Sequence, residues 1–154
     1  MNRSAVSSLI NEWSKPVPVF VYGTLREGGR LRGFYLDDAN VDGKVMRGRV
    51  YGYELIDPAW GFPLLSPSPA ADGEVTGDLQ WVVPDMRLRA MIDMEIGAGY
   101  DLALIDVHTD SLAVPVRALA FTWQRDLPTG SQVVESGDWI GYEMERVSKR
   151  RSMV

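Results

Sequence analysis

The chain has 154 residues, of which 45% are hydrophobic and 24% charged, as is ordinary for a soluble globular protein of one domain's length. It has no cysteine and one histidine, His108, which excludes disulfides, thiolate nucleophiles and cysteine-ligated metals. The net charge of −5 disfavours nucleic-acid binding, because such binding depends on many contacts to phosphates.

We expect a single domain over residues 17–147. An N-terminal leader at 1–16, with one helical turn near Leu9–Trp13, precedes it, and a charged tail at 148–154 follows. No segment has the length and apolar character of a membrane span or a signal peptide. The sequence therefore predicts a cytoplasmic protein that binds neither membranes nor nucleic acid. No pattern indicates its oligomeric state.

The first predicted strand is Val17–Tyr22, which is apolar on both faces and therefore resembles a central, buried strand. Gly23 ends it. A short helix follows at Leu31–Leu36, where Leu31, Phe34 and Tyr35 share one side.

Two strand-like stretches come next, Lys44–Ile56 and Glu74–Val83, separated by a proline-rich loop at Pro58–Asp72. Gly48 and Gly52 interrupt the first stretch. Glycine inside a strand indicates a bulge or a sharp bend, as in a curled or closed sheet.

The strongest helix pattern is Pro84–Ile96, which ends at Gly97-Ala98-Gly99. Strands at Leu102–Thr109 and Val114–Trp123 follow, and a segment at Gly130–Tyr142 precedes the charged tail. This order favours an α+β fold with a barrel-like sheet and few helices.

The first candidate site is the corner Tyr22-Gly23-Thr24-Leu25-Arg26, where the buried strand turns into a loop. Backbone N–H groups lose their ladder partners at such a corner and can converge on a carboxylate. Arg26 adds a guanidinium that can bind a carboxylate with two hydrogen bonds. The alternative interpretation is a tight turn at a strand end.

The second candidate is Glu95, which continues the apolar stripe of Leu88, Met91 and Ile92 along one face of the predicted helix. A carboxyl group on a buried face has a raised pKa, as a general acid or base working near neutral pH requires. Asp93 points to another side, toward water. The alternative is that the last turn frays and Glu95 is solvated.

The third candidate is Ser136-Gly137-Asp138-Trp139, with Tyr142 nearby. Its indole ring either reaches the rim of a pocket or anchors the C-terminal segment to the core. His108 and Asp106 are interpreted as a polar surface pair. The Arg26–Arg30 segment lacks the spacing of a phosphate-binding loop.

Together these motifs resemble the gamma-glutamylcyclotransferase-like, or AIG2-like, family. The resemblance rests on Tyr22-Gly23-Thr24-Leu25-Arg26, on Asp93-x-Glu95 before Gly97 and Tyr100, and on Ser136-Gly137-Asp138-Trp139, and it covers roughly residues 17–142. It implies a small mixed β-barrel that binds a small-molecule γ-glutamyl substrate.

The resemblance also implies a reaction, in which the substrate's α-amino group attacks its own γ-carbonyl, forming 5-oxoproline and releasing an amine. Glu95 would move the protons, while Tyr22, Gly23, Thr24, Leu25, Arg26, Tyr100 and Trp139 would bind substrate. We expect no metal and no other cofactor, since the nucleophile belongs to the substrate.

Recognition of the leaving amine is expected from the loops Arg26–Arg32 and Pro58–Asp72. Two alternatives remain open from the sequence. One is a non-catalytic domain that binds a small carboxylate in the same pocket, and the other is a structural or interaction domain.

Overall fold

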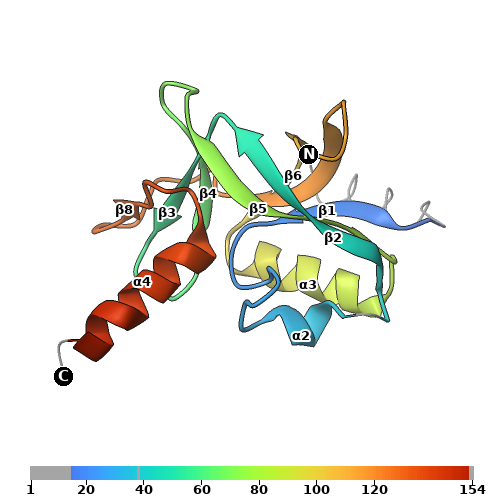
Figure 1. Ribbon diagram of the computed structural model, residues 1–154, viewed down its shortest axis with the longest axis horizontal. Helices are drawn as coiled ribbons and strands as arrows, with labels where there is room; N and C mark the ends of the chain where they lie inside the picture. The colour runs from blue at the N-terminus through green and yellow to red at the C-terminus, as the bar shows by residue number, and fades with distance from the viewer. Residues whose placement is uncertain (1–14, 38, 153–154) are drawn as a thin grey trace.

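The computed structural model describes residues 15–37 and 39–152. The leader's predicted turn near Leu9–Trp13 lies outside these residues. Over the described chain the fold is mixed α+β, as expected, with one larger and one smaller sheet (Figure 1). Among the described helices, none is both long enough and apolar enough to cross a bilayer.

The larger sheet has five strands in the order β2-β5-β1-β7-β6. These strands are β1 (Val17–Val21), β2 (Val41–Tyr51), β5 (Glu74–Val82), β6 (Asp101–Val107) and β7 (Val116–Thr122). The central strand β1 is antiparallel to β5 and parallel to β7. Its apolar side chains are buried on both faces, which confirms the prediction made from the first strand pattern.

The smaller sheet has three strands in the order β4-β3-β8, which are β3 (Tyr53–Asp57), β4 (Leu64–Pro67) and β8 (Gln132–Val133). Gly52, with a φ of 85°, separates β2 from β3. This left-handed conformation suits glycine and turns the chain out of the larger sheet. The stretch predicted as one interrupted run thus contributes to two sheets.

The predicted closed barrel is wrong. In the larger sheet, Gly48 and Gly77 face each other across β2 and β5. Its edge strands meet, within the described residues, at one isolated antiparallel bridge between Arg49 and His108 rather than along a ladder. Closure also fails because β3, β4 and β8 pair among themselves instead of extending the larger sheet.

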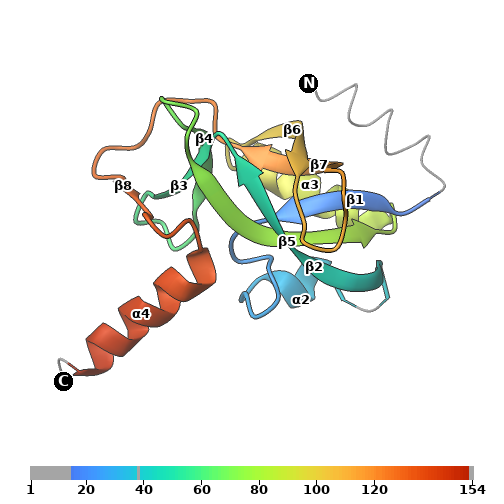
Figure 2. The same cartoon turned by 45° about the horizontal axis from the view of Figure 1, so that its top comes forward.

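Helices α2 (Arg32–Tyr35) and α3 (Met86–Gly97) lie side by side below the larger sheet (Figures 1 and 2). The side chain of Asp85 caps α3 by accepting a hydrogen bond from the Leu88 amide at 2.9 Å. The α3 residues Leu88, Met91 and Ile92 are buried in the core, which confirms the predicted apolar face.

Helix α4 (Trp139–Ser152) projects from the end of the molecule that holds the smaller sheet (Figure 2). No helix was predicted here, and residues 148–152 of α4 fall in the predicted charged tail. Its first turn is anchored, because Trp139 is completely buried and the Tyr142 hydroxyl donates to Asp57 at 2.6 Å. Arg146 pairs with the same carboxylate at 3.3 Å, so a polar cluster holds the helix to β3.

Candidate active site

The end of β1 and the end of α3 line one cavity of about 270 Å³. The predicted site residues Tyr22, Gly23, Thr24, Leu25, Glu95 and Tyr100 all lie in its wall. The remaining lining residues come from β1, β7, α3 and two loops, and they are Phe20, Val21, Leu31, Phe62, Pro63, Met94, Ala98 and Phe121.

In the corner after β1, the carbonyl groups of Gly23, Thr24 and Leu25 accept hydrogen bonds, whereas the amides of the same three residues do not donate any within the described chain. The carbonyl oxygens of Gly23 and Thr24 accept from the amides of Arg26 and Leu31, at 3.1 and 3.0 Å. The carbonyl of Leu25 accepts from the Arg32 guanidinium at 3.2 Å.

By contrast, the N–H groups of Gly23, Thr24 and Leu25 donate to no other described residue. Successive amides without partners attract an anion, because each presents a partial positive charge. The corner therefore has the properties of a carboxylate cradle rather than of a fully satisfied turn.

Glu95 lies inside the last full turn of α3 and not in a frayed end. The amides of Ala98 and Tyr100 both donate to its carbonyl oxygen at 3.1 Å, which closes the helix terminus around it. Glu95 lines the cavity, and burial raises the pKa of its carboxyl group to about 7. The neighbouring Asp93 is exposed, as the helical periodicity predicts.

Two tyrosines next to Glu95 have hydroxyl groups that are already bonded. Tyr22 donates to the carbonyl of Phe121 at 2.5 Å, and Tyr100 donates to the carbonyl of Pro63 at 2.6 Å. Burial, followed by the nearby charge of Glu95, raises the pKa of Tyr100. Burial likewise raises the pKa of Tyr22. Both phenols are therefore neutral hydrogen-bond donors that fix the cavity walls.

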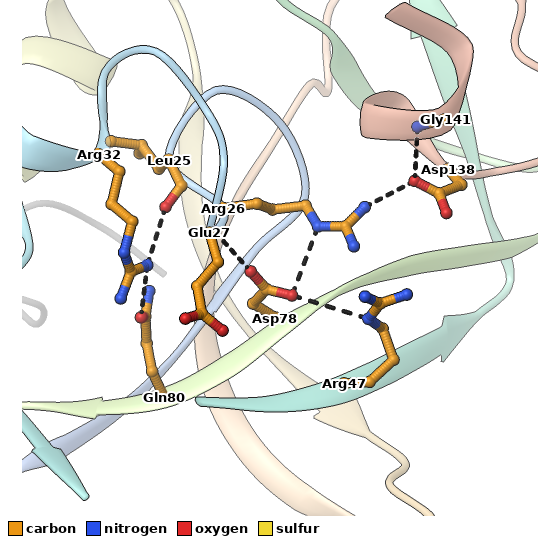
Figure 3. A network of polar contacts seen from close by, with 9 residues as sticks. All are labelled: Leu25, Arg26, Glu27, Arg32, Arg47, Asp78, Gln80, Asp138 and Gly141. Atoms are coloured by element: carbon orange, nitrogen blue, oxygen red, sulfur yellow. Dashed lines mark hydrogen bonds and ion pairs between the residues drawn. The ribbon is translucent and has the colours of Figure 1, made fainter. Parts of the chain in front are cut away.

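Arg26 is not in the cavity wall. The residue is 2% exposed, and its side chain extends away from the corner (Figure 3). There it pairs with Asp78 of β5 at 3.4 Å and with Asp138, just before α4, at 2.8 Å. Arg26 thus fastens the corner to β5 and to the start of α4, and its guanidinium group is not in the cavity wall where a substrate contact was expected.

Asp78 and Asp138 complete this network. Asp78 also accepts from the Glu27 amide at 2.8 Å, which holds the loop that follows the corner. Burial alone would raise the pKa of Asp138, but the Gly141 amide and Arg26 together hold it below its usual value. The ionised carboxylate of Asp138 therefore remains paired with Arg26 at neutral pH.

Trp139 also lies outside the cavity wall. It is completely buried and packs on Tyr142 with ring centroids 5.4 Å apart. This placement matches the aromatic anchor that the sequence left open as the alternative to a pocket rim. The imidazole of His108 packs on Tyr51, away from the cavity lining.

The sequence reasoning did not single out Phe62, Pro63, Met94 or Phe121 as site residues. Phe62 and Pro63 do fall in the loop Pro58–Asp72, and Leu31 falls in the loop Arg26–Arg32. No periodicity marks which loop residue faces a cavity. Met94 could have been predicted from the sequence, since it adjoins Glu95 on the helix. Among the described residues, no group of three or more His, Asp and Glu side chains could hold a metal ion.

Comparison with protein-family models matches residues 19–141 to the family described as gamma-glutamyl cyclotransferase, AIG2-like. A search of curated proteins finds no significant match.

Among solved structures, the uncharacterized protein PH0828 from Pyrococcus horikoshii is 25% identical with a TM-score of 0.61, over 86% of this chain and 97% of that one. An AIG2-like protein from Mus musculus is 24% identical with a TM-score of 0.58, over 73% and 80% of the two chains. YkqA from Bacillus subtilis is 22% identical with a TM-score of 0.64, over 87% of this chain and 43% of YkqA. The fold is shared with these proteins.

Proposed function

Because the chain belongs to the gamma-glutamyl cyclotransferase, AIG2-like family, we propose that it is an enzyme that cyclises a γ-glutamyl amine or a related γ-glutamyl amide. The products are 5-oxoproline and a free amine. One observation carries this proposal, namely that Glu95 and the corner residues Gly23, Thr24 and Leu25 line the same cavity.

The corner would hold the glutamyl part of the substrate. The free N–H groups of Gly23, Thr24 and Leu25 suit its α-carboxylate, which needs several donors once it leaves water. Binding the glutamyl chain between the corner and Glu95 would bring its amino nitrogen near its own γ-carbonyl. An intramolecular attack gains a large effective concentration from such positioning.

Glu95 would move the protons. Its carboxylate first takes a proton from the α-ammonium group, which frees the nitrogen lone pair to form a bond to the γ-carbonyl carbon. Glu95 then passes the proton to the departing nitrogen as the original carbon–nitrogen bond breaks. The attacking nitrogen loses two protons in all and the departing amine gains two, so the reaction balances without water. A carboxyl group with a pKa of about 7 can both accept and donate near neutral pH.

The test measures 5-oxoproline released from a panel of γ-glutamyl amines and amides by the purified chain. We expect Glu95→Gln to lose at least about 100-fold in rate, the scale of a lost general acid–base group. The matched control is Asp93→Asn, which removes an exposed carboxylate from the same helix and should keep activity. Absence of 5-oxoproline across the whole panel would refute the proposal.

The same experiment weighs the alternative of a non-catalytic carboxylate-binding domain. That alternative predicts thermal stabilisation of the chain by γ-glutamyl compounds with no product. The position of Glu95 in the cavity wall favours the enzyme, because a domain that only binds a carboxylate has no use for a second carboxyl group there. A cytoplasmic location stays a prediction from the sequence.

A further inference from the structure

The cavity wall has little charge. Among its described lining residues, Glu95 is the sole acidic or basic side chain. The hydroxyls of Tyr22 and Tyr100 are occupied by backbone carbonyls, and Thr24 adds one neutral hydroxyl. Once the corner amides and Glu95 hold the glutamyl part, the remaining wall is apolar.

The nearest arginines do not change this picture. Arg26 is buried and paired with Asp78 and Asp138 outside the cavity. Arg30 precedes the lining residue Leu31, but its guanidinium donates to the Gly61 carbonyl at 2.6 Å. Arg32 donates to the carbonyl of Leu25 at 3.2 Å and to Gln80 at 2.9 Å. None of these three guanidinium groups lines the cavity, so a carboxylate inside it would meet no cation in the wall.

The exposed part of the cavity wall is apolar apart from Glu95. Leu31, Phe62 and Met94 are partly exposed, as is Glu95, whereas Phe20 and Val21 are buried. The departing amine must leave toward solvent, so it lies against the partly exposed side chains. Two of these residues come from the loops that the sequence assigned to recognition of the amine.

We propose that the substrate's amine part is an uncharged aliphatic or aromatic chain, rather than an amino acid, a peptide or a polyamine. This inference rests on the proposed cyclotransferase function. A carboxylate held against this wall would lose water contacts and meet no cation, and an ammonium group would meet only Glu95, which the proposed chemistry already uses. An alkyl or aryl group would instead be stabilised by leaving water against Leu31, Phe62 and Met94.

A matched substrate set tests the inference. It consists of γ-glutamylbutylamide, the 4-aminobutylamide, which ends in an ammonium group, and the 3-carboxypropylamide, which ends in a carboxylate. We expect kcat/KM for the butylamide to exceed both charged analogues by about tenfold or more. Along an alkyl series, kcat/KM should rise up to about fourfold for each added methylene.

A charge introduced among these partly exposed side chains should change this preference. Leu31→Lys should raise the use of the carboxypropylamide relative to the butylamide by about two- to fivefold, as expected for a partly exposed ion pair. Phe62→Lys makes the same test from the other loop, in case the first variant folds poorly. The control is Leu112→Lys, which alters an exposed leucine in the turn between β6 and β7, outside the cavity wall.

The outcomes separate the inference from the function it rests on. Turnover that favours a charged analogue, or treats all three alike, overturns the inference and leaves the cyclotransferase function intact. If no compound yields 5-oxoproline, the function fails. Calorimetric binding of the same three compounds to wild type and to Glu95→Gln then decides the inference. Tighter binding of the butylamide supports it, whereas equal or absent binding overturns it.

Discussion

Pro63 packs directly against Gly23. A Cβ atom at position 23 would lie 2.6 Å from Cγ of Pro63, closer than real side chains approach. Both residues line the cavity, and the Tyr100 hydroxyl holds the Pro63 carbonyl at 2.6 Å. Tyr100 is in turn packed edge-on against Trp123, with ring centroids 5.4 Å apart. The contact between Gly23 and Pro63 therefore sets the distance between the corner and the opposing loop.

Replacing Gly23 by alanine should disturb the cavity. The added methyl group must displace the rigid Pro63 ring, which should destabilise the chain by about 1–3 kcal/mol and abolish ligand-induced stabilisation. Chemical denaturation with and without a γ-glutamyl compound measures both effects. Gly33→Ala is the control, because nothing lies within 4 Å of its Cβ position in α2. That variant should gain up to about 1 kcal/mol. Equal behaviour of the two variants would contradict the role given to Gly23.

The buried carboxyl group of Glu95 should make stability depend on pH. Its pKa is about 7 in the folded chain, against an ordinary value of 4.5, so the folded state favours the protonated form. The contribution of this protonated carboxyl group to the free energy of unfolding is fully present below about pH 4.5 and is lost as pH rises through about 7. This loss amounts to up to about 3 kcal/mol.

The variant Glu95→Gln stays neutral at every pH. It should match wild type near pH 4 and be more stable by up to about 3 kcal/mol near pH 8, as denaturant titrations at several pH values would show. Asp93→Asn is the matched control, because it removes an exposed carboxyl group from the same helix. A stability difference between wild type and Glu95→Gln that stays constant with pH would mean that the carboxyl group is solvated.

The same pKa predicts the acid limb of the pH–rate profile. Since Glu95 must be ionised to accept a proton, kcat/KM should fall tenfold per pH unit below about pH 7. Initial rates of 5-oxoproline formation between about pH 5 and pH 8 measure this limb. A limb centred near the ordinary glutamate value of 4.5 would place the catalytic carboxyl group in water instead.

Arg26 should matter for folding more than for chemistry. Arg26→Met leaves Asp78, which is 4% exposed, without its buried partner, so we expect a loss of about 3–5 kcal/mol. The double variant Arg26→Met with Asp78→Asn should recover part of this loss, because the unpaired buried charge is gone. Arg47→Gln is the control, since that exposed guanidinium is 3.9 Å from Asp78 and should cost at most about 1 kcal/mol. Urea denaturation of the four chains gives the comparison. A small effect of Arg26→Met would show that the network does not hold the corner.

Elements with strong local patterns could be predicted well. The apolar run of β1 and the apolar stripe of α3 predicted these elements correctly, because both signals are contained in neighbouring residues. The exposed and half-buried positions of Asp93 and Glu95 followed from the same helical periodicity. Helix α4 was not predicted. Its charged sequence has a weak apolar pattern, and its attachment to the body depends on Asp57, a distant residue of β3.

The sequence by itself determined that a buried strand starts at Val17, that a helix follows Pro84, and that Glu95 continues the apolar face of that helix. These properties depend on a few consecutive residues. Only the tertiary structure decided that the sheet stays open, that Arg26 turns toward Asp78 and Asp138, and that Phe62 and Pro63 line the same cavity as Glu95. Each of those outcomes depends on which distant segments pack together, and long-range packing has no periodic signature in a single chain.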